Sequence, residues 1–122
     1  MNSLADQSYI SLSTRKRDGS FVATPVWCAG DEQHIFVFSA GEAGKVKRLR
    51  NFSDCQVAAC DFKGKLTGRY LPAKAFLIDG EEARDAHHAL RKKYGWQMKL
   101  LDFGANISGR ARRRAFIRID LF

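Results

Sequence analysis

The stretch His34–Asn51, HIFVFSAGEAGKVKRLRN, decides the architecture, because it passes from a strand through a loop into a helix. Its first half is a run of apolar residues that ends at Ser39, and its second half begins a short basic helix at Lys45. Gly41 and Gly44 lie in the loop, where glycine lets the backbone turn and approach a ligand closely. A helix N-terminus adds unpaired N–H groups and roughly half a positive charge. The stretch therefore predicts a site for a phosphorylated ligand at the start of the helix.

Three basic side chains occupy the first turns of that helix. Lys45 and Arg48 lie three residues apart on one flank, beside the apolar Val46 and Leu49. Lys47 projects on the other side but still belongs to the first turn. The ordinary alternative is a solvated basic helix, because charge runs are usually exposed. The segment has neither a Walker A loop nor a Gly-x-Gly-x-x-Gly motif, so neither nucleotide fingerprint applies.

Length and composition predict a single folded domain over residues 1–122. Of the 122 residues, 45% are hydrophobic, which favours a globule over a disordered chain. No apolar run approaches the ~20 residues of a membrane span, and no secretory signal is visible. The three cysteines Cys28, Cys55 and Cys60 cannot pair completely, which favours a reducing, cytoplasmic location. Cys55 and Cys60 are expected on opposite faces of a strand, so no metal site is predicted.

The charge balance favours an anionic partner. The formal net charge is +8 and the pI is near 9.8. Such a surplus is typical of proteins that bind nucleic acid, a phosphorylated cofactor or an acidic substrate. Composition alone does not choose among these three classes.

Period-two patterns and turn signals predict a mainly β fold. The expected strands are residues 9–14, 21–29, 34–39, 55–62, 70–78 and 115–122. A helix is expected from Asp79, which would cap it in a capping box with Glu82, to a stop at Gly95. The amphipathic pattern of residues 96–103 does not decide between helix and strand. Six strands with one or two helices predict a small β-barrel.

Pro25 interrupts the otherwise regular strand pattern FVATPVWCA at residues 21–29. Because proline removes a donor from the hydrogen-bond ladder, the strand is expected at a sheet edge or a bulge. Backbone groups next to Pro25 would then be free to meet a ligand, and Trp27 on the same face would offer an aromatic surface. The alternative is an edge strand whose tryptophan simply packs in the core.

The order of these features resembles the pyridoxamine 5′-phosphate oxidase-like (PPOX class) split β-barrels, and among them the small F420-dependent and FMN-binding oxidoreductases. The segments that carry the resemblance are DGSFVATPVWCA at 18–29 and AGKVKRLRN at 43–51, with YGW at 94–96 as a weaker addition. It extends over almost the whole chain. It implies a homodimeric, six-stranded split β-barrel with two cofactor sites in grooves between the subunits.

The resemblance also implies which residues bind the cofactor. Lys45 matches the lysine that opens the helix and holds the cofactor phosphate, with Lys47 and Arg48 as helpers. Ser39, at the end of a strand, is placed to donate a hydrogen bond. The backbone along the tricyclic ring and the neighbouring aromatic side chain would come from Thr24, Pro25, Val26 and Trp27.

The chain departs from the true pyridoxamine-phosphate oxidases at its C-terminal end. Those enzymes carry arginine and histidine there, whereas this chain has no histidine after His88, so vitamin B6 oxidation is not expected. The cofactor is either FMN, with one terminal phosphate, or the deazaflavin F420, with a phosphodiester and an acidic tail. Loop cations slightly favour F420 by offering partners for that tail, although they are equally ordinary as solubilising residues: Arg15, Lys16, Arg17, Lys63 and Lys65.

The expected function is hydride transfer between the bound cofactor and a small-molecule substrate, the cofactor supplying the reactive chemistry. No catalytic side chain is identified: His87 and His88 lack the i, i+4 spacing of a zinc pair, and His34 is expected to be structural. Two alternatives stay open. One is a flavin or heme carrier of the same fold without turnover. The other is a barrel that binds single-stranded nucleic acid through Arg110–Arg114.

Overall fold

A computed structural model describes residues 4–31, 33–41, 43–108 and 114–121 of the chain. The elements in these ranges are η1 (Leu4–Asp6), β1 (Tyr9–Arg15), β2 (Phe21–Val26), β3 (Cys28–Gly30), β4 (His34–Ala40), α1 (Gly44–Asn51), β5 (Asp54–Cys60), β6 (Leu71–Ile78), α2 (Gly80–Tyr94), α3 (Trp96–Ser108) and β7 (Arg114–Leu121). The predicted mainly β fold is therefore confirmed.

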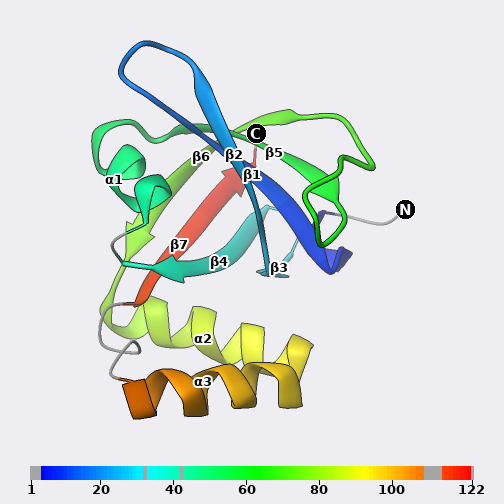
Figure 1. The fold of residues 1–122 in the computed structure, drawn as a ribbon, viewed down its shortest axis with the longest axis vertical. Coiled ribbons are helices and arrows are strands. Elements are labelled where there is room, and N and C mark those ends of the chain that lie inside the picture. The colour runs from blue at the N-terminus through cyan, green and yellow to red at the C-terminus, as the bar shows by residue number, and fades with distance from the viewer. Residues whose placement is uncertain (1–3, 32, 42, 109–113, 122) are drawn as a thin grey trace.

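The strands form one antiparallel sheet that curls into a half-barrel (Figure 1). Their order is β2-β1-β5-β6-β7-β4-β3, so β2 and β3 are the two edge strands. These edge strands follow each other in the chain and are separated by Trp27 alone. The chain therefore crosses from one edge of the sheet to the other at a single residue.

This crossing corrects the expected continuous strand over residues 21–29. β2 pairs with β1, whereas β3 pairs with β4, so the pattern that looked like one strand is two strands with different partners. The sheet consequently has seven strands rather than the predicted six. The predicted edge position of Pro25 is confirmed, because β2 has a strand partner on one side only.

Apolar side chains that alternate along the strands fill the inside of the half-barrel. The fully buried ones include Ile10, Leu12, Ile35, Val37, Val57, Ile117 and Ile119. α1 lies against β1 and β6 and buries Val46 and Leu49. Burial of each such side chain contributes about 1.5–3 kcal/mol, so this packing fixes the position of α1 on the barrel.

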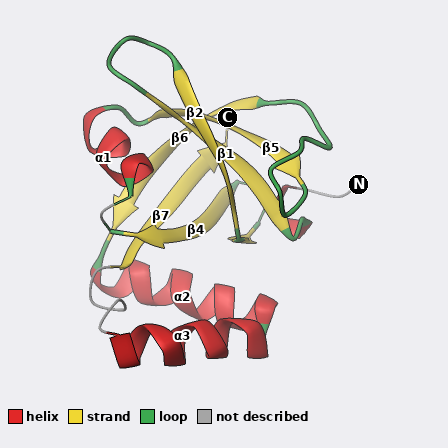
Figure 2. Ribbon diagram, viewed as in Figure 1, coloured by secondary structure: helices red, strands yellow, loops and turns green. Residues whose placement is uncertain are grey.

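α2 and α3 lie side by side at one end of the half-barrel (Figure 2), where α2 contacts β3, β4 and β7. The predicted stop at Gly95 is confirmed: its φ is +58° and its N–H donates to the Arg91 carbonyl at 2.8 Å. Asp79 is the N-cap residue of α2, as predicted, but the expected capping box does not form. The Asp79 side chain makes no cap hydrogen bond, and Glu82 accepts a hydrogen bond from Arg118 of β7 at 2.7 Å.

The undecided stretch 96–103 is helical and belongs to α3. Met98 and Asp102 point inward and are buried, whereas the large apolar side chains of Trp96, Leu100 and Phe103 are 69%, 60% and 66% exposed. The helix therefore buries a narrow face and presents a wide apolar one. That arrangement explains why its hydrophobic pattern was ambiguous.

Candidate functional site

A groove of about 370 Å³ lies where the two edges of the sheet part, and we call it the Trp27 groove. Pro25 and Val26 of β2 line one side, and Phe38 and Ser39 of β4 line another. Its other lining residues are Tyr9, Trp27, Ala43, Lys45 and Leu101. The groove thus brings together five of the eight residues that the sequence predicted for the cofactor: Pro25, Val26, Trp27, Ser39 and Lys45.

Aromatic contacts hold the Trp27 side chain in place in the Trp27 groove. Its ring stacks on Tyr94 with centroids 4.4 Å apart and planes 8° apart, and it meets Phe38 edge-on at 6.2 Å. The Tyr94 hydroxyl accepts the N–H of Cys28 at 2.9 Å and lies 2.8 Å from the Ser8 carbonyl. α2 therefore fixes the tryptophan, because Tyr94 is its last residue.

Lys45 is the one charged side chain among the described residues that line the Trp27 groove. It is half-buried, and no ion pair is found for it in the described part of the chain. Burial lowers the pKa of its ammonium group, and the positive charge of Arg48 lowers it further. The negative charge of a bound anion would oppose both effects and raise this pKa, so the electrostatics here favour a negatively charged ligand.

The start of α1 adds backbone donors next to Lys45. Ala43 is the N-cap and makes no side-chain cap, and the first turn has no acidic residue. The N–H groups of Val46 and Lys47 point back to the Ala43 carbonyl, at 3.1 Å and 3.3 Å. Within the described ranges, the N–H groups of Gly44 and Lys45 donate no backbone hydrogen bond. A helix start of this kind attracts anions.

Thr24, also predicted for the cofactor, lies on β2 but is not among the residues that line the groove. Its Oγ1 is buried and has no hydrogen-bond partner in the described structure. An unsatisfied buried polar atom costs about 1–3 kcal/mol, so a ligand group or water that reached it would stabilise the strand. The next residue, Pro25, is exposed at the sheet edge, and a Cβ atom at Gly64 would lie 3.5 Å from its Cδ.

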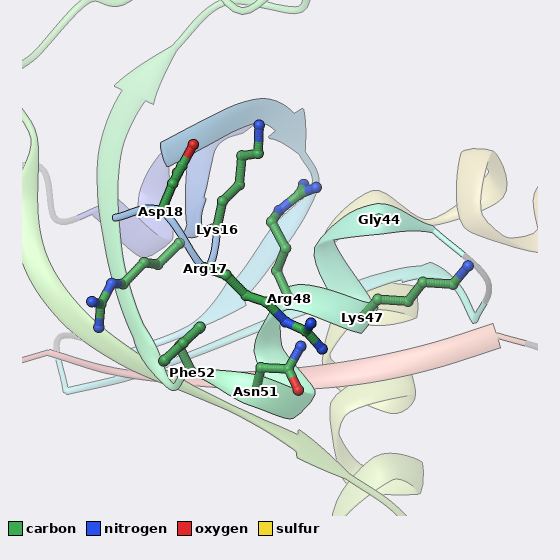
Figure 3. Close-up of a pocket in the computed structure, with 9 residues that line it drawn as sticks. Lys16, Arg17, Asp18, Gly44, Lys47, Arg48, Asn51 and Phe52 are labelled. Atoms are coloured by element: carbon green, nitrogen blue, oxygen red, sulfur yellow. The ribbon is translucent and has the colours of Figure 1, made fainter. Parts of the chain in front are cut away.

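Lys47 and Arg48 line a second groove, of about 480 Å³, on the other side of the α1 start (Figure 3). We call it the basic groove; its lining residues are Arg15, Lys16, Arg17, Asp18, Gly44, Lys47, Arg48, Asn51 and Phe52. A hydrogen bond positions the Arg48 side chain there, because its Nε donates to Thr14 Oγ1 at 2.6 Å. The three predicted basic residues of α1 are therefore divided between two grooves.

Sequence reasoning missed a buried ionic cluster behind the groove wall. The Asp102 carboxylate of α3 lies 2.7 Å from Arg114 Nη1, 2.9 Å from Arg91 Nε and 3.0 Å from His87 Nε2. Burial alone would raise the pKa of Asp102, but the hydrogen bonds from Arg114 and His87 hold it below its usual value. The Arg114 guanidinium also lies 4.9 Å from the centre of the Phe38 ring, which lines the groove. No signal in the sequence connects these distant residues.

The histidines show no catalytic arrangement. His87 is engaged by Asp102, His88 is exposed on α2, and His34 Nδ1, at the start of β4, lies 2.9 Å from Asp120 Oδ1 of β7. Among the described residues, no group of three or more His, Cys, Asp or Glu side chains is arranged to hold a metal ion. The cysteines are free and buried.

The basic segment Arg110–Arg114 lies outside the described residues except for Arg114. That side chain is only 10% exposed and is engaged by Asp102. Arg114 is thus part of the interior and not of an open nucleic-acid surface. No helix in the described ranges combines the length and apolar character that crossing a membrane requires.

The sequence matches no family profile and no curated protein. The fold, in contrast, is shared with several solved structures. The heme storage protein HutZ from Vibrio cholerae superposes with a TM-score of 0.72 at 11% identity, over 98% of this chain and 84% of its own. A Listeria innocua protein with the provisional name pyridoxamine 5′-phosphate oxidase superposes with a TM-score of 0.62 at 14% identity, over 97% of this chain and 86% of its own.

A Bacteroides thetaiotaomicron protein, provisionally named a 5-nitroimidazole antibiotic resistance protein, gives a TM-score of 0.69 at 12% identity, over 97% of this chain and 75% of its own. At identities this low, the superpositions establish the fold but do not identify a ligand. The resemblance in sequence motifs and the superpositions point to the same architecture. The chain has the fold of the pyridoxamine 5′-phosphate oxidase-like split barrels.

Proposed function

We propose that the protein binds a phosphorylated flavin-type cofactor, F420 or FMN, in the Trp27 groove and acts as an oxidoreductase on a small-molecule substrate. The observation that carries the proposal is the position of Lys45. A half-buried ammonium without a counter-ion among the described residues lines a groove whose other lining residues are mostly apolar and aromatic. Such a groove suits a ligand that is flat and apolar at one end and anionic at the other.

The described residues fit such a cofactor in two respects. The ammonium group of Lys45 and the backbone N–H of the same residue would hold the phosphate. Val26 and Trp27 offer apolar surface for the ring. When bound, the cofactor supplies hydride chemistry. The protein's own contribution is to orient the ring, neutralise the phosphate and exclude water.

The exposed apolar face of α3 beside the groove supports a homodimer. The groove itself, at about 370 Å³, lies within the range for small-molecule sites, about 300–1,000 Å³. Leu101 lines the groove from α3, whose neighbouring apolar side chains are exposed. A second subunit placed against this face would deepen the groove and cover the apolar surface.

A heme carrier is the second candidate, because HutZ, with which the chain shares its fold, is a heme storage protein. Axial ligands of heme iron are histidine, cysteine, methionine or tyrosine. Among the described residues that line the Trp27 groove, Tyr9 alone has such a side chain. The flavin-type cofactor therefore fits the donor set better than heme does.

The experiment is a titration of the purified, cofactor-free protein with FMN, F420 and heme in parallel, followed by fluorescence and absorbance. Saturable binding of FMN or F420 near one per subunit supports the proposal and identifies the cofactor. The oligomeric state is measured on the same samples by sedimentation. Binding of heme alone would favour the carrier, and failure of all three would overturn the cofactor assignment while leaving the fold unchanged.

A further inference from the structure

We propose that the basic groove is a separate binding site for a compact polyphosphate, such as a free triphosphate or the triphosphate group of a nucleotide. The proposal does not depend on the proposed function, because the Trp27 groove and the basic groove share no lining residue. The basic groove is the larger of the two, at about 480 Å³ against 370 Å³. It is also the one in which charge is concentrated.

Two elements build this groove from opposite sides. The β1–β2 hairpin contributes Lys16 and Arg17, and its turn is fixed by Asp18, whose carboxylate accepts the Ser20 hydroxyl at 2.6 Å and the Ser20 N–H at 2.9 Å. Opposite it stands α1, anchored to β1 by the bond from Arg48 to Thr14. Figure 3 shows Lys16 and Arg17 on the hairpin beside α1, whereas Lys47 points outward from the helix.

The charge on this surface is largely uncompensated. Five cationic side chains line the groove against one carboxylate, and that carboxylate is occupied by Ser20. Arg15 has a partial partner in Asp54, at 3.7 Å. For Arg17 and Lys47, no ion pair or side-chain hydrogen bond occurs within the described residues. Like charges that line one groove repel one another, so a multivalent anion would relieve the repulsion.

The number and type of the cations favour a multivalent oxyanion such as a polyphosphate. Arginine presents a planar fork of donors that matches pairs of oxyanion oxygens, and three of the five cations are arginines, so several charged oxygens can be bound at once. Arg48 uses its Nε on Thr14, while its Nη1 lies above Gly44, where a Cβ atom would approach it to 2.8 Å. The glycine therefore allows the guanidinium to lie close to the start of α1 and to the groove.

A nucleic-acid strand fits the groove less well than a compact anion. Proteins that bind single strands stack successive bases on aromatic rings along a site of about 4–16 nucleotides. Phe52 is the one aromatic side chain lining this groove, and the Arg15 guanidinium lies 4.5 Å from its ring centre. The described surface thus offers no open aromatic platform for bases.

The experiment is calorimetric titration of the cofactor-free protein with inorganic tripolyphosphate, ATP, adenosine and inorganic phosphate at constant ionic strength. We expect tripolyphosphate to bind at least about tenfold more tightly than phosphate, ATP to bind comparably and adenosine not to bind. Lys16→Ala and Arg17→Ala should each weaken the binding of tripolyphosphate about three- to tenfold. The matched control is Lys92→Ala, which removes an exposed charge on α2 and should change the affinity for tripolyphosphate less than twofold.

Competition decides whether the site is separate. We expect saturating FMN to leave tripolyphosphate binding within about threefold. The proposal is overturned if tripolyphosphate binds no better than phosphate, if Arg17→Ala binds like Lys92→Ala, or if FMN abolishes the binding. Displacement by F420 but not by FMN would also overturn it, because the groove would then belong to the cofactor's acidic tail. If an oligonucleotide bound tightly and tripolyphosphate did not bind, the surface would be a nucleic-acid site instead.

Discussion

Replacement of Lys45 by methionine tests the cofactor site most directly, because it removes the charge and keeps the apolar stem. A hydrogen bond between charged groups contributes about 1.5–3 kcal/mol, and the half-buried position of Lys45 limits screening by water. We therefore expect Lys45→Met to weaken FMN or F420 binding about ten- to hundredfold. Because the free ammonium is desolvated and lies near Arg48, its loss should not destabilise the unliganded protein.

The comparison variant is Lys47→Met, which removes the same charge from the same helix. Lys47 is exposed and lines the basic groove, so we expect less than about a threefold change in cofactor affinity. Fluorescence titration gives both affinities, and urea unfolding shows that each variant is folded. Equal losses for the two variants would mean that α1 acts through its overall charge, and the assignment of Lys45 would be wrong.

The same lysine predicts how cofactor binding depends on pH. The pKa of Lys45 is lowered in the free protein, first by burial and then by Arg48, and a bound phosphate should raise it again. Affinity should be constant while free Lys45 keeps its proton and should fall as the pH rises through its lowered pKa. Titrations above about pH 7 avoid protonation of the phosphate itself. Lys45→Met should lose this dependence; if the dependence persists, another group causes it.

Three further predictions concern the structure around the site. Asp102→Asn leaves the buried Arg114 without its counter-charge and should cost about 3 kcal/mol, read by urea unfolding. Since the folded-state pKa of Asp102 is lowered, its stabilisation is present above about pH 4 and should be lost as the pH falls through the lowered value. Tyr94→Phe removes the acceptor of the Cys28 N–H and should cost about 1–2 kcal/mol, with a change in the fluorescence of the stacked tryptophan. Burial raises the pKa of the Cys55 thiol to about 12, so native protein at pH 8 should not react there with a thiol reagent, whereas unfolded protein should.

Each of these predictions has a clear contrary result. A loss under about 1 kcal/mol for Asp102→Asn, no greater than for exposed Asp85→Asn, would show that the ionic cluster does not hold α3 in place. Unchanged stability of Tyr94→Phe would mean that water replaces the hydroxyl. Rapid labelling of Cys55 in the native state would show that β5 opens readily.

The sequence by itself determined the local elements, and it predicted an anion site at the start of α1. Strand alternation, the Asp-Gly turn and the glycine stop predicted most elements to within a few residues, because these signals act between near neighbours. The loop and basic helix of residues 39–48 predicted a phosphate site for the same reason, and the predicted edge position of Pro25 follows from its missing N–H. Each of these inferences needed only a short window of chain.

Only the tertiary structure decided how those pieces combine. The pattern of residues 21–29 reads as one strand, yet the closing sheet gives its two halves different partners and places Trp27 between them. In the sequence the basic residues of α1 form one cluster. In the structure the helix packs against β1, and Lys45 lines one groove whereas Arg48 lines another. Glu82 reads as a capping residue, yet Arg118 of a distant strand engages it instead. In every case the deciding contact joins residues far apart in the chain, and a pattern confined to neighbours carries no information about such contacts.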